Sequence, residues 1–491
     1  MPSSSPKAQK QTLQQRRTKI VATLGPASNS PEMVEKLLKV GVDVVRLNLS
    51  HGDHAQHREM FALVRSTATA LGRHVAILMD LCGPKIRTGR FPDGEITLKT
   101  RQKVVVTTRD VLGQDGLIPS QYRNLHKDVN PGERILLDDG NLELAIDSIE
   151  EREIHCRVIT GGVLRNHKGM NLPGSTLSVA AFSPKDREDA TLAAELGADF
   201  LALSFVRNAG DIQTLRRHLD KLGSTIPIIA KIEKPEAVTN IDEIFAQVYG
   251  IMIARGDLGI ELPAEQVPLI QRDLIQHARL YSKPVIVATQ MLESMTNNPS
   301  PTRAEVSDVA TAALAGTDAV MLSGETASGK YPLRAVNTMD KILREMESYQ
   351  LKQDRFGELV PSHDASLDPQ RRAIARAVLG MTGQLDIQAI VIPTHSGLTA
   401  GIIAAARPTS PCVGVSDSSE VSRRLALHWG IIPVFMSKEE QSKNWHVLSE
   451  NIANHHGLIR TGNTLLLVSG FSDNPMLSEP VIKILNLAPS K

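Results

Sequence analysis

Eight short apolar runs recur along the chain, and most of them end in a cluster of polar residues. In order they are KIVATLG, VVRLNLSHG, VAILMDLCG, DFLALSFVR, PIIAKIE, GIMIARGD, PVIVATQ and DAVMLSGET. Strands that are apolar throughout are buried on both faces, which is typical of a parallel sheet covered by helices. Eight such strands with helices between them predict an α/β fold built on one closed TIM-type (β/α)8 barrel.

Helix start and stop signals separate these runs. Ser30, Ser183 and Thr302 are expected N-caps, the first two followed directly by proline and the third followed by a glutamate three residues later. Gly197 and Gly316 come where two of these helices should stop. The alternation of strand, helix and glycine continues almost to residue 350, so we expect the barrel to comprise residues 18–87 and 183–350.

The interval 88–182 breaks this alternation. It is rich in alternating β-type segments, namely EITLKT, KVVVTT, RILLDDG, LELAIDSI and IHCRVIT. An interval of this length is far too long for a strand-to-helix loop. We expect a small β-barrel domain inserted after the third strand, on the rim where a barrel carries its active site, in a position to act as a lid.

The two ends of the chain and one stretch near residue 360 have other patterns. Residues 1–17 are polar and are expected to form a flexible tail, with an organelle transit peptide as a weaker alternative because this segment has no acidic residue. Residues 351–370 read as a linker. Residues 371–491 contain the runs AIVIPT, CVGVS, IIPVFM and TLLLVSG separated by helices, which predicts an open α/β domain.

The composition narrows the possible partners and compartments. The net charge is +1 and aromatic residues make up only 3% of the chain, so neither nucleic acid nor a membrane surface is an expected partner. No apolar run has the length that a membrane helix needs. The three cysteines form no Cys-x-x-Cys pair, which fits a reducing, cytoplasmic location.

Two carboxylates and a lysine stand at the ends of neighbouring predicted strands. Glu233 and Asp257 would face one cavity, which suits Mg²⁺ because this ion accepts one or two protein carboxylates and keeps positions for phosphate and water. Gly256 removes a side chain beside them and would let a ligand approach the backbone. A salt-bridged rim involving Lys231 or Lys234 is the alternative interpretation.

Lys231 allows three roles. Its charge could neutralise a transferring phosphoryl group, it could form a Schiff base, or it could belong to a structural ion pair. The neighbouring carboxylates would keep it charged, which disfavours the Schiff base. Arg46 and Arg87 on the same rim indicate anion binding, since guanidinium groups match phosphate oxygens in a bidentate way.

Three further features carry less information by themselves. Thr289 ends a strand and could hold a water molecule or only cap the backbone. His51, His54 and His57 could suggest zinc, but Asp53 is better read as the cap of the following helix. The segment THSGLTAG, beginning at Thr394, follows a strand and opens a helix, where backbone amides could hold a phosphate or form an ordinary turn.

Taken together, the motifs resemble those of pyruvate kinase from about residue 17 to the end of the chain. They are TKIVATLGPAS, VVRLNLSHG, GPKIRTG, KGMNLPG, AKIEKPEAV, MIARGDLGIE, ATQMLESM, PTRAEVSDVA and AVMLSGETASGKYP. The resemblance implies transfer of the phosphoryl group of phosphoenolpyruvate to ADP, followed by protonation of the enolate, to give pyruvate and ATP. It also implies a homotetramer and a C-terminal effector domain.

Residue roles follow from the resemblance, motif by motif. Glu233 and Asp257 would bind Mg²⁺, with a second Mg²⁺ arriving with ADP. Lys231 would stabilise the transferring phosphoryl group and Arg46 would bind the substrate's phosphate. The amides of Gly256 and Asp257, with Thr289, would place the substrate's carboxylate and the proton-donating water. The residues expected at the nucleotide are Asn48, Ser50, His51, Arg87 and Lys168.

The chain departs from the family pattern at two places. Lys85 stands where many members have glutamate, and in the family lysine here accompanies independence of K⁺. We therefore expect the monovalent-cation pocket, formed by Asn48, Ser50, Asp80 and the Leu81 carbonyl, to work without K⁺ because the Lys85 ammonium supplies the charge.

The second departure lies in the expected effector loop, whose residues are Thr394, His395, Ser396, Gly397 and Thr399. Leu398 occupies a position where members that bind sugar phosphates often have a basic residue. Another phosphorylated effector, such as AMP or a pentose phosphate, is therefore expected rather than fructose 1,6-bisphosphate. Two other functions stay open at this point: a barrel lyase or aldolase acting on a keto acid through Lys231, and a catalytically silent metabolite sensor.

Overall fold

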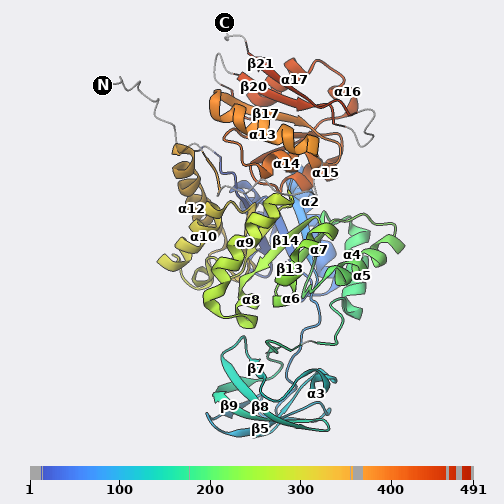
Figure 1. Cartoon of the computed structure of the whole chain (residues 1–491), viewed down its shortest axis with the longest axis vertical. Coiled ribbons are helices and arrows are strands. Elements are labelled where there is room, and N and C mark those ends of the chain that lie inside the picture. Colours follow the sequence, from blue (N-terminus) through green and yellow to red (C-terminus); the bar gives the residue numbers. More distant parts are fainter. Residues whose placement is uncertain are drawn as a thin grey trace.

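A computed structural model describes residues 13, 15–175, 177–353, 355–357, 369–459, 464–471 and 478–487. The described chain forms three tiers along the longest axis of the molecule (Figure 1). The C-terminal sheet lies at one end, the barrel lies in the middle, and the insert lies at the other end. Among the described residues, no helix is both long enough and apolar enough to cross a membrane.

The central tier is a closed eight-stranded parallel barrel, as predicted from the eight apolar runs. Around the barrel the order is β1-β16-β15-β14-β13-β12-β3-β2. Its strands are β1 (Lys19–Leu24), β2 (Val44–Asn48), β3 (Ala76–Asp80), β12 (Phe200–Leu203), β13 (Ile228–Ile232), β14 (Gly250–Ala254), β15 (Val285–Ala288) and β16 (Ala319–Leu322). Nearly every residue in them is buried, because side chains on one face fill the barrel and those on the other contact the helices.

Helices cover the outside of the barrel, and their ends match the sequence signals. Ser30, Ser183 and Thr302 cap helices with their side chains, and Gly197 and Gly316 end two of them in the left-handed conformation. The helices are α1 (Pro31–Lys39), α2 (His54–Ala70), α4 (Pro184–Leu196), α5 (Ala209–Lys221), α6 (Pro235–Thr239), α7 (Ile241–Gln247), α8 (Arg255–Glu261), η1 (Ala264–Gln266), α9 (Val267–Leu280), η2 (Glu293–Thr296), α10 (Arg303–Ala315), α11 (Gly324–Ala327) and α12 (Pro332–Lys352).

The insert follows β3 and returns to the barrel at α4. It contains β4 (Glu95–Leu98), β5 (Lys103–Thr107), β6 (Leu117–Pro119), α3 (Leu125–Asp128), β7 (Arg134–Leu137), β8 (Leu142–Glu150), β9 (Glu153–Thr160), β10 (Gly162–Arg165) and β11 (Met170–Asn171). Hydrogen bonds do not close these strands into one ring as expected for a small β-barrel. They form a six-stranded sheet and a separate β10-β4 pair, and the two share one hydrophobic core.

The C-terminal tier is an open sheet with the order β19-β18-β17-β20-β21. The predicted parallel strands are present, and an antiparallel edge strand, β21, was not predicted. The elements are α13 (Pro369–Gln384), β17 (Ile387–Pro393), α14 (Leu398–Ala405), β18 (Cys412–Ser416), α15 (Ser419–Leu425), β19 (Ile431–Phe435), α16 (Lys438–Gln441), α17 (Trp445–His455), β20 (Thr464–Ser469) and β21 (Val481–Asn486). Most of the expected linker, 354 and 358–368, lies outside the described residues.

The last residues of the expected flexible tail are part of the folded structure. Residues 1–12 and 14 lie outside the described residues, but Arg16 and Arg17 are already part of the fold. Arg16 donates to the Gly41 carbonyl and pairs with Asp43 at 2.7 Å. The Arg17 amide donates to Glu347 Oε2 at 2.6 Å, and Arg17 is buried.

Candidate active site

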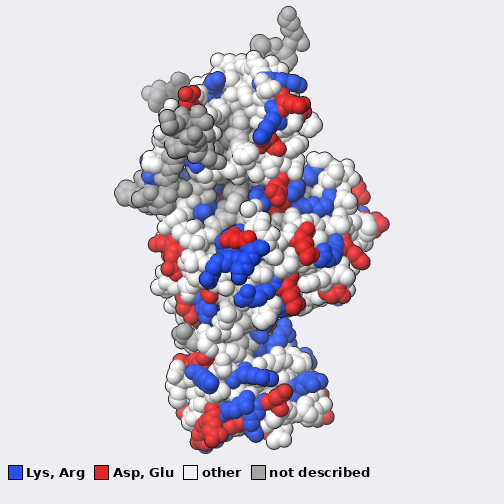
Figure 2. Space-filling model, turned by 90° about the vertical axis from the view of Figure 1, so that its right-hand side faces the viewer, with Lys and Arg blue, Asp and Glu red and all other residues white. Residues whose placement is uncertain are grey.

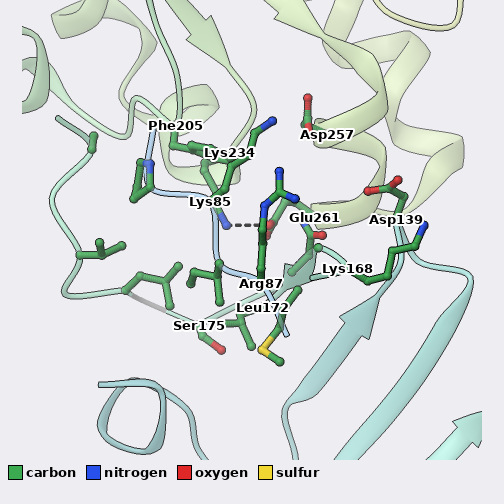
Figure 3. A pocket seen from close by; sticks show the side chains of 18 of the residues that line it. Lys85, Arg87, Asp139, Lys168, Leu172, Ser175, Phe205, Lys234, Asp257 and Glu261 are labelled. Carbon is green, nitrogen blue, oxygen red and sulfur yellow. Dashed lines mark hydrogen bonds and ion pairs between the residues drawn. The ribbon is translucent and has the colours of Figure 1, made fainter. Parts of the chain in front are cut away.

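The carboxyl ends of the barrel strands and the insert enclose a cavity of about 350 Å³ (Figure 3). Asp257 and Glu261 reach it from the barrel, and Asp139 and Lys168 reach it from the insert. Of the residues expected at the site, His51, Arg87, Lys168 and Asp257 line this cavity, as does Lys85. The barrel's other expected groups lie at the strand ends and do not line it.

Lys231 is the centre of a buried ionic cluster at those strand ends. Its Nζ lies 2.8 Å from Glu233 Oε1 and 3.6 Å from Asp80 Oδ1. Burial alone would lower the pKa of Lys231, but the charges of Asp80 and Glu233 outweigh it, and the pKa is raised. The amine is therefore held as a cation, which suits charge stabilisation and disfavours Schiff-base formation.

Ser204 and Phe205 position this cluster, and the sequence analysis assigned neither of them a role. Ser204 Oγ accepts a hydrogen bond from Lys231 Nζ at 2.8 Å and donates to the Leu81 carbonyl at 2.8 Å. The Phe205 amide donates to Glu233 Oε2 at 2.8 Å, from a backbone with φ of +54°. Both residues directly follow β12 within the run DFLALSFVR, so their place at a strand end was the available signal.

Arg46 closes the cluster on the other side of Asp80. Its Nε and Nη2 both lie 2.7 Å from Asp80 Oδ2, and its Nη1 donates to Thr23 Oγ1 at 3.1 Å. Burial would raise the pKa of Asp80, but the charges of Lys231 and Arg46 overcome this effect and lower it. Asp80 Oδ1 is buried without a hydrogen-bond partner, so one oxygen of this anionic centre is left for a ligand.

Asp257 has no compensating partner of its own. It lies in the first turn of α8, and its carboxylate makes no hydrogen bond or ion pair with any residue that the structure describes. Burial and the charge of Glu233 raise the pKa of Asp257 to about 6. A buried carboxylate without a partner, next to that of Glu233, fits a divalent, oxygen-seeking cation such as Mg²⁺. The described residues contain no group of three or more histidine, cysteine, aspartate or glutamate side chains that could hold a metal ion, so water and substrate would have to complete the coordination of an ion bound here.

Thr289 stands on a strained turn directly beside Asp257. Thr289 and Gln290 have φ of +67° and +54°. Such a value is uncommon for any residue other than glycine, and it is especially unusual for a β-branched residue such as threonine. Thr289 Oγ1 accepts from the Gly256 amide at 2.7 Å, and a Cβ at Gly256 would lie 3.3 Å from that oxygen. The glycine therefore permits a close approach of Thr289 to the backbone, whereas the sequence analysis expected it to admit a ligand.

Arg255 holds this turn, a role that the sequence analysis missed although the residue lies in the quoted run GIMIARGD. Its Nη2 donates to the Thr289 carbonyl at 2.9 Å and to the Gln290 carbonyl at 2.8 Å. Its Nη1 donates to Asp308 Oδ2 at 3.1 Å. Two carbonyls bound by one guanidinium offset the cost of two left-handed residues.

Three of the five residues expected at the nucleotide, His51, Arg87 and Lys168, line the cavity. Lys168 comes from the insert and pairs with Asp138 at 2.7 Å, while Arg87 Nη1 donates to the His167 carbonyl at 3.2 Å. Burial, with the charges of Lys85, Arg87 and Arg46, lowers the pKa of His51 and favours its neutral form. Asn48 and Ser50 sit together at the end of β2, where Asn48 Oδ1 accepts from the Ser50 amide.

The expected monovalent-cation pocket is partly occupied by protein groups. Asp80 is bonded to Arg46, and the Leu81 carbonyl accepts from Ser204, as described above. Lys85 is exposed and makes no ion pair with any described residue. Its charge lowers the pKa of Asp257 and of His51, so it acts on the cavity through space.

The expected effector loop lies in the C-terminal tier, away from the cavity (Figure 1). It joins β17 to α14 as predicted, with Gly397 at φ of +85° donating its amide to Thr394 Oγ1 at 3.0 Å. Burial would raise the pKa of Asp417, but the hydrogen bond and charge of His395, whose Nδ1 lies 3.0 Å from Asp417 Oδ1, together with the charge of Lys438, overcome this effect and lower it. Ser396 is exposed and Thr399 is buried.

The chain is similar to known proteins in both its sequence and its fold. The family model "Pyruvate kinase, barrel domain" matches residues 15–336, and "Pyruvate kinase, alpha/beta domain" matches residues 372–485. Pyruvate kinase 2 of Synechocystis is 42% identical over 96% of this chain and 79% of its own. Pyruvate kinase of Mycobacterium intracellulare is 45% identical over 86% of this chain and 89% of its own. A pyruvate kinase structure from Cryptosporidium parvum covers 96% of both chains with a TM-score of 0.86 and 34% identity. This chain belongs to the pyruvate kinase family.

Proposed function

We propose that the mouth of this barrel transfers the phosphoryl group of phosphoenolpyruvate to ADP and protonates the resulting enolate, giving pyruvate and ATP. The observation that carries the proposal is the buried cation of Lys231 held between Asp80 and Glu233, with the uncompensated Asp257 beside it. In this proposal residues 88–182 act as the lid, and residues 371–491 form an effector domain.

Glu233 and Asp257 are the proposed Mg²⁺ ligands, and a second ion would arrive with ADP. When bound, Mg²⁺ supplies positive charge to phosphate oxygens and keeps coordination positions for water and substrate. Glu233 has one oxygen fixed by Lys231 and the other by the Phe205 amide, which orients its carboxylate in advance.

Lys231 would stabilise the charge on the phosphoryl group as it moves. A loose phosphoryl transition state needs positioning and positive charge more than covalent help. Arg46 would bind the phosphate of phosphoenolpyruvate, with its guanidinium already oriented by Asp80 and Thr23. Neighbouring carboxylates raise the pKa of Lys231, so its amine is a poor nucleophile, which is why we do not favour the lyase or aldolase alternative.

The backbone amides of Gly256 and Asp257 would bind the substrate's carboxylate. Because the Gly256 amide donates to Thr289 Oγ1, the carboxylate would replace this bond, and the hydroxyl, which donates to the Ala288 carbonyl at 2.6 Å, could then accept from water. Thr289 could then hold the water that gives its proton to the enolate carbon. Asn48, Ser50, His51, Arg87 and Lys168 would meet the nucleotide, and closure of the insert would exclude water that could otherwise accept the phosphoryl group.

One assay tests the reaction against both alternatives. Phosphoenolpyruvate, ADP and Mg²⁺ should yield pyruvate, measured by a coupled reaction. A lyase would instead give no nucleotide-dependent product, and borohydride with a keto acid would label Lys231. A metabolite sensor would show ligand binding without turnover.

We further propose that K⁺ is not required, because Lys85 places a positive charge at the active-site cavity and acts on Asp257 there. Activity in sodium or bulky-cation buffer should equal that in potassium buffer. A large stimulation by K⁺ would contradict this proposal, and Lys85→Glu should create such a stimulation if it is correct. Asp80 Oδ1, which is buried without a hydrogen bond and lies 3.6 Å from Lys231 Nζ, is the oxygen that such a cation would then meet.

Regulation, assembly and location are also proposals. A phosphorylated effector such as AMP or a pentose phosphate would bind at Thr394, His395, Ser396, Gly397 and Thr399, and titration of each candidate against the substrate saturation curve would identify it. The chain would form a homotetramer, which light scattering of the full chain would measure. Three free cysteines support a reducing, cytoplasmic location.

A further inference from the structure

A second hollow, of about 570 Å³, lies in the insert next to the cavity of the active site. His167 lines both. The second hollow is formed by the segments 89–90, 108–112 and 119–123 together with His167. In the space-filling view of Figure 2, Lys and Arg side chains gather on the visible face of the insert and at its junction with the barrel.

The lining of this hollow is basic. It contains the guanidinium groups of Arg90, Arg109 and Arg123 against one carboxylate, that of Asp110. Arg109 is paired with Glu153 at 2.7 Å. Arg90 and Arg123 are exposed, and their guanidinium groups make no hydrogen bond or ion pair with any described residue. Two guanidinium groups without acidic partners therefore face one hollow.

We propose that this hollow binds a small phosphate-bearing anion through Arg90 and Arg123. Guanidinium groups donate in pairs to phosphate oxygens, and two of them fit a dianion better than a single carboxylate. Gln121 borders the same space, and its side-chain amide has a second N–H besides the one directed at His167 Nδ1.

Part of the wall of the hollow belongs to the segment 87–90, which connects the barrel to the insert. The Gln121 amide donates to the Arg87 carbonyl at 2.9 Å, and the His167 amide donates to the Gly89 carbonyl at 3.1 Å. Gln121 Nε2 also lies 2.9 Å from His167 Nδ1. An anion in the hollow would therefore stabilise the backbone that carries Arg87 and Lys168 into the active-site cavity.

Hydrogen exchange of the full chain can test this site with inorganic phosphate as the probe. Phosphate should slow amide exchange in peptides covering 108–114, since residues 108–112 line the hollow and none of the segment lines the active-site cavity. Sodium chloride of equal ionic strength serves as the reference for general screening. Equilibrium dialysis with labelled phosphate gives the number of saturable sites per chain.

Variants separate this hollow from other phosphate sites. Arg90→Gln and Arg123→Gln should each weaken the phosphate-dependent protection about 10-fold, and the double variant should lose it together with one dialysed site per chain. Arg123→Lys keeps the positive charge but loses the paired N–H donors of the guanidinium group. Its phosphate concentration for half-maximal protection should therefore lie between those of the unmodified chain and Arg123→Gln. Arg101→Gln removes an exposed arginine of the insert that does not line the hollow, and should leave the protection unchanged.

Three results would overturn the proposal. The first is the absence of phosphate-dependent protection of 108–114 in the unmodified chain. The second is an unchanged phosphate concentration for half-maximal protection in the double variant, and the third is an equal loss of protection in Arg101→Gln. The last result would mean that the insert attracts anions only through its overall charge. Circular dichroism of each variant confirms that it is folded, and the single variants carry the test if the double variant is not.

Discussion

The two ends of the barrel differ in whether protein groups pair with their buried charged side chains. At the mouth, Asp257 has no partner, and Lys231 and Asp80 belong to a cluster with an oxygen to spare. At the opposite end, where the strands begin, protein groups complete the carboxylates. Asp318 accepts from the Arg407 guanidinium at 3.0 Å and from the Trp429 amide at 3.0 Å.

The C-terminal domain supplies most of these closing contacts. Lys19 Nζ donates to the Ile431 carbonyl at 2.6 Å, and Tyr249 forms a 2.6 Å hydrogen bond with His428. Leu427 packs with the residues that fill the barrel and is fully buried. The C-terminal domain thus completes one end of the barrel with a leucine and fixed polar partners, whereas the other end is left for a ligand to complete.

Because of this difference, we expect residues at one end of the barrel to affect ligand binding and residues at the other end to affect stability. A charge left without a protein partner costs free energy in the ligand-free chain and becomes favourable when a ligand supplies the opposite charge. A charge completed by the protein contributes to one fixed structure. Substitutions at the mouth should therefore change catalysis more than stability, and substitutions at the closed end should do the reverse.

Lys231→Met should have the largest effect. It removes the cation expected to stabilise the transferring phosphoryl group, and kcat should fall at least about 1,000-fold. Thermal unfolding should change little in the presence of Mg²⁺, because the ion replaces part of the lost positive charge. Lys221→Met, at the exposed end of α5, is the matched control and should retain activity. A Lys231→Met enzyme within a few fold of the unmodified rate would remove this residue from the mechanism.

Leu427→Ala tests the closed end. Deleting a fully buried leucine should cost about 2–5 kcal/mol, because a cavity opens against the barrel core. Urea unfolding followed by circular dichroism measures the loss, while kcat and KM for phosphoenolpyruvate should stay near their original values. Leu269→Ala removes a leucine that is 63% exposed and should be nearly neutral. A large fall in kcat without loss of stability would mean that the two ends are coupled.

His428 should make the closed end sensitive to acid. Burial lowers the pKa of His428 to about 4 from 6.5, with the charges of Arg407 and Lys19 acting in the same direction against that of Asp318. Between these values the unfolded chain binds a proton that the folded chain does not. Stability is therefore present above pH 6.5 and is lost as the pH falls toward 4, by up to about 3 kcal/mol.

His428→Gln isolates this contribution, since glutamine can still bond Tyr249 but does not titrate. The difference in unfolding free energy between the two proteins should change with pH between 6.5 and 4 and stay constant above 6.5. Parallel pH profiles for both proteins would show that His428 takes up its proton equally in the folded and unfolded chains.

The barrel was predictable because each of its strands is marked by local pattern. A parallel strand buried on both faces must be apolar throughout, and runs such as PIIAKIE and PVIVATQ have no other simple interpretation. The edge strand β21, VIKILN, was missed because its burial alternates irregularly and much of it is exposed. The insert was recognised as a β domain, but alternation does not specify which strands pair, so its division into a six-stranded sheet and a β10-β4 pair was not predictable.

The site divides in a similar way. The gathering of Glu233, Asp257 and Lys231 was predictable, because charged side chains at the ends of apolar strands lie on one rim. Ser204 and Arg255 were not, because their importance depends on which atom each one contacts. A serine after a strand is common, and only the fold shows that its hydroxyl lies between Lys231 Nζ and the Leu81 carbonyl.

Ser204→Ala should have the smallest effect and gives the finest test of the difference between the two ends. The hydroxyl accepts one hydrogen bond from Lys231, so its loss should lower kcat about 10-fold through a less fixed ammonium group, with KM for ADP unchanged. Ser204→Thr keeps the hydroxyl and should restore most of the rate, which a purely structural role in packing would not predict. If Ser204→Ala instead lowered stability and left kcat unchanged, Ser204 would act like the groups at the closed end. The protein would then pair with the charge at the mouth for stability rather than leave it for a ligand.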